Sequence, residues 1–183
     1  VARDAMEINR IIMDIFIEEQ LPALSFRPLS CMVSKNGLLS QSFFEPILQA
    51  IIQNFIPVVY GDVIFDKSWK TTIFSGETTI FYLIPYLIKK RFSINSIIQV
   101  SNYNGIHDIN GKTVPLITNK NWSIIKKHIF SSNVPDVTGG MNHKIETALK
   151  IAKMGIKTII IDGTNPNNLL KVIQGEKLGT EIF

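Results

Sequence analysis

Three short runs of almost uninterrupted apolar residues constrain the fold of this chain more than any other feature. They are Val58–Tyr60, Ile97–Val100 and Thr158–Ile161, and segments with helical periodicity separate them. Strands that are apolar at nearly every position are buried on both faces, as in parallel sheets that helices cover on both sides. Alternation of such strands with helices predicts an α/β layered fold with a largely parallel central sheet.

The remaining elements are predicted from apolar periodicity and from turn residues. A further strand is expected at Ala23–Phe26, and the polar turn Lys67–Lys70 indicates a hairpin between Val63–Asp66 and Thr71–Phe74. Helices are predicted at Ala5–Glu19, Glu45–Phe55, Thr78–Phe92 (apart from Pro85), Asn121–Phe130, Met141–Met154 and Asn167–Ile173. Because no repeat or low-complexity linker interrupts this pattern, we predict a single domain over residues 1–183.

Cysteine and histidine usage excludes several kinds of site. The single cysteine, Cys31, excludes an intramolecular disulfide framework and a cysteine-cluster metal site. The histidines, His107, His128 and His143, lack metal-ligand spacing, so we predict no metal site built from protein side chains.

The longest apolar stretch, Thr79–Ile88, is too short to cross a bilayer, and the chain does not open on a signal-peptide pattern. We therefore expect a cytoplasmic protein without a membrane partner.

The charge balance favours a small anionic substrate over a nucleic acid. The formal net charge is +4, and the dense basic clusters are Lys89–Arg91 and Lys126–His128. A nucleic-acid surface shows a longer basic stripe with interleaved aromatic residues. We interpret both clusters as solvated helix faces and expect no nucleic-acid partner, whereas a mild excess of lysine suits a phosphate.

Small polar residues follow each of the three apolar strands. They are Gly61-Asp62, Ser101-Asn102 and Asp162-Gly163. In parallel α/β sheets, ligands bind at the carboxyl ends of the strands. Glycine at position 61 allows a ligand to approach the backbone closely. The alternative is that Gly61-Asp62 is only the turn by which the chain leaves the sheet.

The most specific motif is Asp136-Val137-Thr138-Gly139-Gly140-Met141-Asn142-His143-Lys144. Two glycines directly before a helix let backbone N–H groups approach an anion at the helix N-terminus, where the helix dipole also favours negative charge. Lys144 lies one turn further on and can reach the same anion. The alternative is an ordinary glycine-containing loop with a surface lysine. The spacing is not that of a P-loop.

Ser75-Gly76-Glu77 precedes another predicted helix. A carboxylate at this position commonly acts as a helix cap or dipole partner. A second interpretation is an acid that positions a lysine or a metal ion in a phosphate site.

Taken in this order, the segments resemble the amino acid kinase superfamily, and most closely its isopentenyl phosphate kinases. Asp136–Lys144 matches the family motif D-V-T-G-G-M-x-x-K as it stands. Thr72–Glu77 is similar to the family's I-x-S-G-D junction, and Ile56–Asp66 to its strand and Gly-Asp turn on the acceptor side. Ser101–Asp108 resembles its nucleotide-binding turn, and Leu169–Ile182 its C-terminal segment.

The resemblance implies a three-layer α/β/α sandwich, a homodimer and Mg²⁺-dependent transfer of the ATP γ-phosphoryl group to isopentenyl phosphate. The product, isopentenyl diphosphate, serves isoprenoid biosynthesis. Lys144 and Glu77 correspond to catalytic residues, and Gly61 and Asp62 lie on the acceptor side. Nucleotide contacts are implied for Ser101, Gly105, Asp108, Asp136, Gly139, Gly140 and Lys144.

Three departures from the family pattern keep alternatives open. We expect the family's N-terminal strand and glycine-rich loops to be missing from this chain, which would leave apolar surface uncovered and favour self-association. Glu77 stands where the family has aspartate, and its extra methylene moves the carboxylate outward by roughly 1.5 Å. Asn102 and His107 replace an aspartate and a tyrosine. The alternatives are a kinase of the same superfamily acting on another small phosphate, phosphonate or carboxylate, and a non-catalytic nucleotide-binding fragment or subunit.

Overall fold

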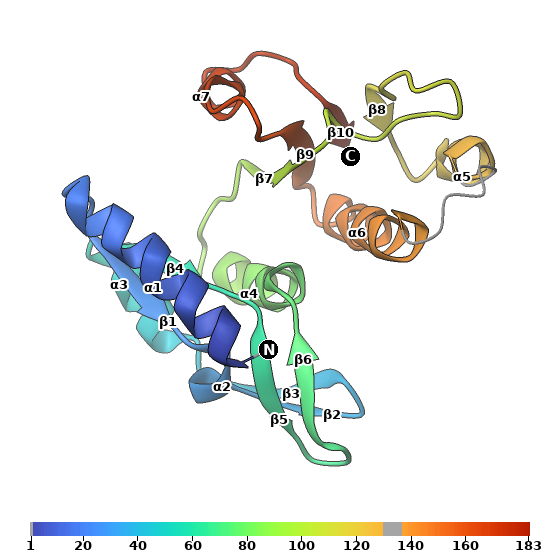
Figure 1. Ribbon diagram of the computed structural model, residues 1–183. Coiled ribbons are helices and arrows are strands. Elements are labelled where there is room, and N and C mark those ends of the chain that lie inside the picture. The colour runs from blue at the N-terminus through green and yellow to red at the C-terminus, as the bar shows by residue number, and fades with distance from the viewer. Residues whose placement is uncertain (1, 130–136) are drawn as a thin grey trace. The chain divides into compact units, whose positions relative to one another are not determined.

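The computed structural model describes residues 2–129 and 137–183, and it divides the chain into two compact units (Figure 1). Unit 1 is Val1–Ser93 and unit 2 is Ile94–Phe183. That the two units together form the single domain expected for residues 1–183 stays a prediction. No helix among the described residues is long and apolar enough to cross a membrane.

Unit 1 consists of two small sheets and the helices that pack against them. In chain order its elements are α1 (Ala2–Glu18), β1 (Ala23–Phe26), α2 (Pro28–Cys31), β2 (Met32–Lys35), β3 (Leu38–Ser42), α3 (Glu45–Ile52), β4 (Ile56–Val59), β5 (Asp62–Asp66), β6 (Lys70–Phe74) and α4 (Gly76–Lys89).

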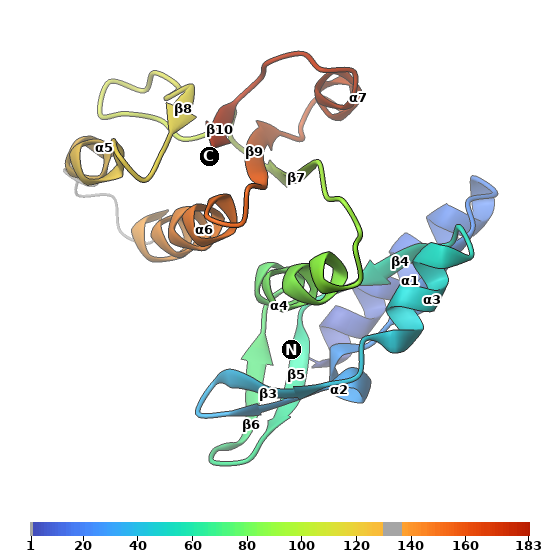
Figure 2. The same ribbon diagram turned by 180° about the vertical axis from the view of Figure 1, so that it is seen from behind.

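The first sheet of unit 1 is a parallel pair, β1 and β4, in which Ala23 lies opposite Ile56. Helices α1 and α3 lie on opposite faces of this pair, as the front and back views show (Figure 2). Because parallel strands end at the same edge, the residues after Phe26 and after Val59 are brought together. This edge carries the site described below.

The second sheet of unit 1 has the strand order β3-β2-β5-β6. Strands β5 and β6 form the antiparallel hairpin that the sequence predicts. A second hairpin, β2–β3, joins it through parallel pairing of β2 with β5. The sequence analysis missed β2 and β3, because these strands are short and carry serine, lysine and glutamine among their apolar residues.

Unit 2 is built around one four-stranded sheet. Its elements are β7 (Ser96–Ser101), β8 (Leu116–Ile117), α5 (Trp122–Ile129), α6 (Val137–Ala152), β9 (Lys157–Asp162), α7 (Asn167–Ile173) and β10 (Thr180–Ile182). The strand order is β7-β9-β10-β8, with β9 parallel to β7 and antiparallel to β10.

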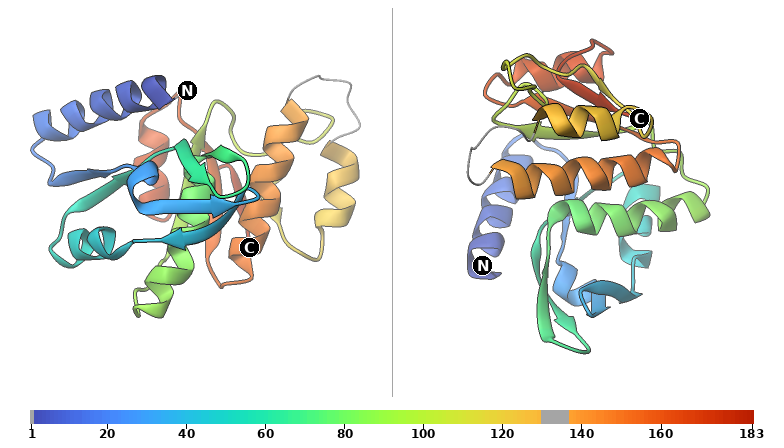
Figure 3. Two further views of the ribbon diagram at one scale, coloured as in Figure 1. Left: turned by 90° about the horizontal axis from the view of Figure 1, so that it is seen from below. Right: turned by 90° about the vertical axis from the view of Figure 1, so that its right-hand side faces the viewer.

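Helices α6 and α7 cover opposite faces of this sheet (Figures 1 and 3). The alternation of side chains along β9 explains why both faces need a cover. Ile160 packs into one cluster with Ile145 and Leu149 of α6, whereas Ile159 and Ile161 pack with Val172 of α7. Strand β9 is therefore buried on both faces, as its apolar run predicts.

The predicted α/β class with parallel-rich sheets is confirmed, with corrections to the sheet and to the starts of several helices. We expected β4, β7 and β9 in one central sheet, but β4 pairs with β1 in a separate sheet. An apolar run indicates that both faces of a strand are buried, but it does not determine which strand pairs with it. Helix α4 begins at Gly76 and continues through Pro85, and α6 begins at Val137, so Gly139 and Gly140 lie in its first turn and not in a preceding loop.

One buried carboxylate, Asp66, holds the two hairpin turns of unit 1 together. It accepts backbone hydrogen bonds from Gly37 at 2.9 Å in one turn and from Ser68 and Trp69 at 2.8 Å in the other. The hydroxyl of Ser34 donates a further bond at 2.8 Å. Burial alone would raise the pKa of Asp66, but these hydrogen bonds hold it well below its usual range.

The low pKa of Asp66 predicts an acid-sensitive contribution to stability. A carboxyl whose pKa is depressed by folding stabilises the folded state above its unfolded pKa of about 4, and the contribution is lost as the pH falls towards the folded pKa. Asp66→Asn should therefore lower the urea midpoint at pH 7, and the difference from the wild type should shrink below pH 4. Asp14→Asn, at an exposed position, is the control. An Asp66→Asn deficit of constant size from pH 7 to pH 3 would contradict this account.

Candidate functional site

The carboxyl-terminal edge of the β1–β4 pair is held by an ion pair between Arg27 and Asp62. The Nε of Arg27 donates to Oδ2 of Asp62 at 2.7 Å, and the backbone N–H of Val63 donates to Oδ1, also at 2.7 Å. The Asp62 side chain is fully buried, whereas that of Arg27 is 33% exposed. The hydrogen bond to Asp62 raises the pKa of Arg27, and burial raises the pKa of neighbouring Tyr60.

This pairing gives Asp62 a structural task that the sequence did not reveal. Asp62 was predicted as an acceptor-side residue, but its carboxylate is already engaged by Arg27 and by the backbone. Removing one partner of a buried pair leaves an uncompensated charge, which is strongly destabilising. Asp62 therefore acts within unit 1 by fixing the chain around Gly61. The sequence does contain a signal for this pair. Arg27 directly follows β1, and Gly61-Asp62 comes just after β4, the strand parallel to it.

Gly61 lies where the chain passes close to the start of α4. A Cβ atom at position 61 would lie 3.2 Å from the backbone nitrogen of Gly76 and 3.3 Å from the carbonyl oxygen of Phe74. These are backbone atoms that cannot move aside freely, so glycine is needed for this close approach. The predicted residue Gly61 and the Ser75-Gly76-Glu77 segment are thereby brought together within unit 1.

The start of α4 is capped by Ser75. The Ser75 hydroxyl accepts a hydrogen bond from the backbone N–H of Thr78 at 3.1 Å, so Ser75, and not the carboxylate considered in the sequence analysis, is the N-cap of this helix. Glu77 lies in the first turn of α4, where a negative charge is favoured by the helix dipole. Its predicted catalytic role stays a prediction.

In unit 2, the predicted nucleotide-side residues Ser101 and Gly105 lie at one end of the sheet. Ser101 is opposite Asp162 in the register of β7 and β9, and its carbonyl oxygen accepts the N–H of Gly163 at 2.8 Å. Gly105 has φ +84°, and a Cβ atom there would overlap the side chain and backbone of Thr180. Only glycine fits this position.

Thr180 ties the Gly105 turn to the sheet, a role that was not predicted from the sequence. Its hydroxyl accepts the N–H of Ile106 at 2.7 Å and donates to the carbonyl oxygen of Val114 at 2.7 Å. The side chain is fully buried, so both hydrogen bonds are protected from water. Asp108 accepts the N–H groups of Asn110 and Lys112 at 2.9 Å, which closes a local turn.

The N-terminus of α6 carries the glycines for which the sequence predicts anion binding, and this role stays a prediction. Gly139 and Gly140 stand in its first turn, where backbone N–H groups have no partner within the helix. Lys144 follows one turn later and is half-buried. A short turn joins the end of α6 to the start of β9, so the helix and the strand run antiparallel. The start of α6 therefore lies towards the carboxyl end of β9. Asp136 lies outside the described residues.

The described side chains of the two units show no group of three or more histidine, cysteine, aspartate or glutamate residues able to hold a metal ion. Mg²⁺ commonly binds through one or two carboxylates together with substrate phosphates, so a nucleotide-borne Mg²⁺ does not need such a group.

The sequence of residues 2–162 matches the model of the amino acid kinase family. The chain belongs to this family. The resemblance found from its motifs is thereby confirmed, and the parallel-rich sheets are those the family predicts.

The chain is similar along its length to several known proteins of this family. An isopentenyl phosphate kinase of Methanocaldococcus jannaschii is 30% identical over 182 residues, which cover 100% of this chain and 66% of that protein. A solved structure of isopentenyl phosphate kinase superposes with a TM-score of 0.79 at 22% identity, covering 97% of this chain and 66% of that one. A glutamate 5-kinase of Thermosynechococcus vestitus is 48% identical over only 52 residues, or 28% of this chain and 14% of that protein. The chain thus spans just under two thirds of the length of the Methanocaldococcus relative.

The Arg27–Asp62 pair should matter more for stability than an exposed ion pair of the same chemistry. Arg10 and Asp14 form such a pair on α1, with both side chains more than half exposed, and provide the matched control. Arg10→Met is expected to change the free energy of unfolding by at most about 0.5 kcal/mol. Arg27→Met should lower the urea midpoint clearly more, because it leaves the Asp62 carboxylate buried without its partner. Equal effects of the two substitutions would show that the Arg27–Asp62 pair does not hold this edge.

Proposed function

We propose that the protein containing this chain is a cytoplasmic phosphotransferase that uses Mg²⁺–ATP to phosphorylate isopentenyl phosphate, giving isopentenyl diphosphate. The observation that carries the proposal is the 30% identity to an isopentenyl phosphate kinase along the entire chain. The glycine-containing start of α6, with Lys144 one turn later, supplies the chemistry that binding the ATP phosphates requires.

Unit 2 carries the nucleotide side in this proposal. First-turn N–H groups of α6, at Gly139 and Gly140, donate to phosphate oxygens, and the Lys144 ammonium neutralises charge on the transferring group. The turn at Ser101–Asp108 accommodates the nucleoside, because the positive φ of Gly105 shapes its backbone and Thr180 fixes it to the sheet. Asp136 belongs to the same proposed set.

Unit 1 carries the acceptor side. The backbone at Gly61 offers a surface without a side chain, and the Arg27–Asp62 pair keeps it in place. Glu77, at the start of α4, orients basic groups around the transferring phosphoryl group. Arg27 and Asp62 are positioning residues in this scheme.

The reaction requires little covalent chemistry from the protein. A phosphate oxygen of isopentenyl phosphate attacks the γ-phosphorus of ATP, the bond from that phosphorus to the β–γ bridging oxygen breaks, and ADP leaves with the electron pair. Positioning and electrostatic stabilisation account for most of the rate in such transfers. Mg²⁺ enters with ATP as part of the substrate.

We also propose that the protein is a homodimer. The apolar side chains of α1 support this, since the helix has no buried residue and six of its apolar side chains are exposed: Met6, Ile8, Ile11, Ile12, Ile15 and Ile17. Exposed apolar patches of this kind mark interaction surfaces.

Substitution of Lys144 tests the proposed function. The protein to use is the longest chain encoded by the reading frame that contains these residues, and ³¹P NMR follows ATP consumption with isopentenyl phosphate or glutamate as acceptor. Lys144→Gln should lower kcat/KM for isopentenyl phosphate by roughly 100- to 1000-fold. Lys153→Gln, at an exposed position after α6, should leave it unchanged.

Each contrary outcome selects an alternative. Turnover with glutamate but not with isopentenyl phosphate would indicate another kinase of the family, as the short match to a glutamate 5-kinase allows. A folded protein that binds ATP and phosphorylates neither acceptor would be a nucleotide-binding protein without this activity. Glu77→Asp would then be the first substitution to assay, because the family has aspartate at this position.

A further inference from the structure

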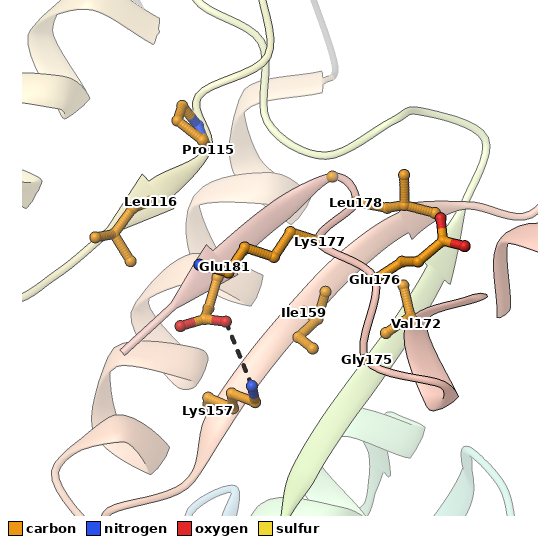
Figure 4. A pocket seen from close by; sticks show the side chains of 11 residues that line it. Pro115, Leu116, Lys157, Ile159, Val172, Gly175, Glu176, Lys177, Leu178 and Glu181 are labelled. Carbon is orange, nitrogen blue, oxygen red and sulfur yellow. Dashed lines mark hydrogen bonds and ion pairs between the residues drawn. The ribbon is translucent and has the colours of Figure 1, made fainter. Parts of the chain in front are cut away.

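A cavity of about 310 Å³ opens on the α7 face of the unit 2 sheet (Figure 4). It lies among β8, β9, β10 and the loop from Gly175 to Gly179. None of the nucleotide-side residues Ser101, Gly105, Asp108 or Lys144 lines it. Glu181 of β10 lines the cavity. Its neighbour Thr180, which fixes the Gly105 turn, faces the opposite side of the sheet, because side chains alternate along a strand. The cavity is therefore separate from the nucleotide side of the proposed reaction.

The floor and walls of this cavity are apolar. Ile159 of β9 and Val172 of α7 form its buried part, and Leu178 closes one end. Pro115 and Leu116 line the far wall on the edge strand β8. Leu116 is 45% exposed, which leaves an apolar surface that a ligand can cover.

Two ammonium groups and one carboxylate face the opening. Lys157 Nζ lies 3.5 Å from Oε2 of Glu181, a long contact for an ion pair. The Lys177 side chain extends across the opening towards β10, and it has no hydrogen bond or ion pair with any part of the chain that the structure describes (Figure 4). The carboxylate of Glu176 points away from the Lys157–Glu181 pair. The two lysines and two glutamates of the lining balance in charge, but Glu181 lies beside Lys157 and Glu176 points elsewhere, so the Lys177 ammonium is the charge available to a ligand.

We propose that this cavity binds a small amphiphilic anion, with an apolar body of about five or six carbon atoms and a single phosphate or carboxylate head group. The apolar body covers Ile159, Leu178 and Leu116, while the head group accepts hydrogen bonds from Lys177 and Lys157. Lys177 is the principal ligand because its ammonium has no competing acceptor, whereas Lys157 is shared with Glu181. The Glu181 carboxylate disfavours polyanions, which distinguishes this site from one for a nucleoside triphosphate.

The cavity is expected to bind only ligands that combine an apolar body with an anionic head group. Each methylene added to the body should strengthen binding roughly fourfold while the cavity has room, because burial of apolar surface drives that part of the affinity. Inorganic phosphate has the head group without the body, and hexanol has the body without the charge. Both should bind far more weakly than hexanoate or hexyl phosphate.

Methyl-group NMR on the full chain tests the proposal. Hexanoate should produce saturable shifts of the Ile159, Val172 and Leu178 methyl signals, and butyrate should bind roughly 15-fold more weakly, at about fourfold for each methylene. Lys177→Gln should weaken hexanoate binding about tenfold by removing a charge-assisted hydrogen bond. Leu116→Trp should block it sterically at an edge position that tolerates bulk, and Lys153→Gln should change nothing.

Hexyl phosphate separates this site from the proposed acceptor site, because an alkyl phosphate also resembles isopentenyl phosphate. Shifts at Ile159 and Leu178 that disappear in Lys177→Gln, while kinase activity is retained, belong to the cavity. If the unsubstituted protein shows these shifts but does not phosphorylate isopentenyl phosphate, the proposed function is contradicted and the cavity assignment stands. An absence of shifts at these methyl groups, or equal weakening by Lys153→Gln, would overturn the cavity assignment whatever the fate of the kinase activity.

Discussion

The two-sided burial of β9 is the constraint on which unit 2 depends. Its alternating side chains pack against α6 on one face and α7 on the other, so the strand cannot slip by one residue without exchanging the two apolar sets. This register places Ser101 opposite Asp162 and Thr180 opposite Ile160. The strand ends that carry the predicted nucleotide-side residues are therefore positioned by hydrophobic packing, and the hydrogen bonds of Thr180 fix the Gly105 turn to them.

In unit 1 the corresponding constraint is steric and electrostatic. Gly61 lets the backbone after β4 lie against the start of α4, and the Arg27–Asp62 pair joins the ends of two parallel strands. The carboxylate of Asp66 plays a similar part further along β5, where it collects hydrogen bonds from two turns. Both aspartates belong to the strand that begins at Asp62. Asp62 and Asp66 both hold the backbone of unit 1 in place, and the predicted acceptor-side role of Asp62 stays a prediction.

Sequence patterns predicted the positions of helices and strands well where apolar periodicity is strong. They predicted poorly which strands pair with one another. Strand β9 and helix α7 were predicted almost to the residue, since the spacing of their apolar residues and the turns beside them are local features of the sequence. The β2–β3 hairpin was missed although Asn36 and Gly37 both adopt positive φ, and Asn-Gly is a strong hairpin signal. The sheet to which β4 belongs was predicted wrongly, because partner choice depends on residues distant in sequence. The roles of Arg27 and Thr180 likewise arise only when separate strands come together.

The proposed activity depends on a local claim: that the first turn of α6 binds the phosphates of Mg²⁺–ATP. Amide NMR of the full chain during titration with Mg²⁺–ATP tests this most directly. The account predicts saturable shifts of the Gly139 and Gly140 amide signals, the largest in unit 2, with the Gly105 amide shifting at the same ligand concentrations. Saturable ATP binding that leaves the Gly139 and Gly140 amides unmoved would contradict it.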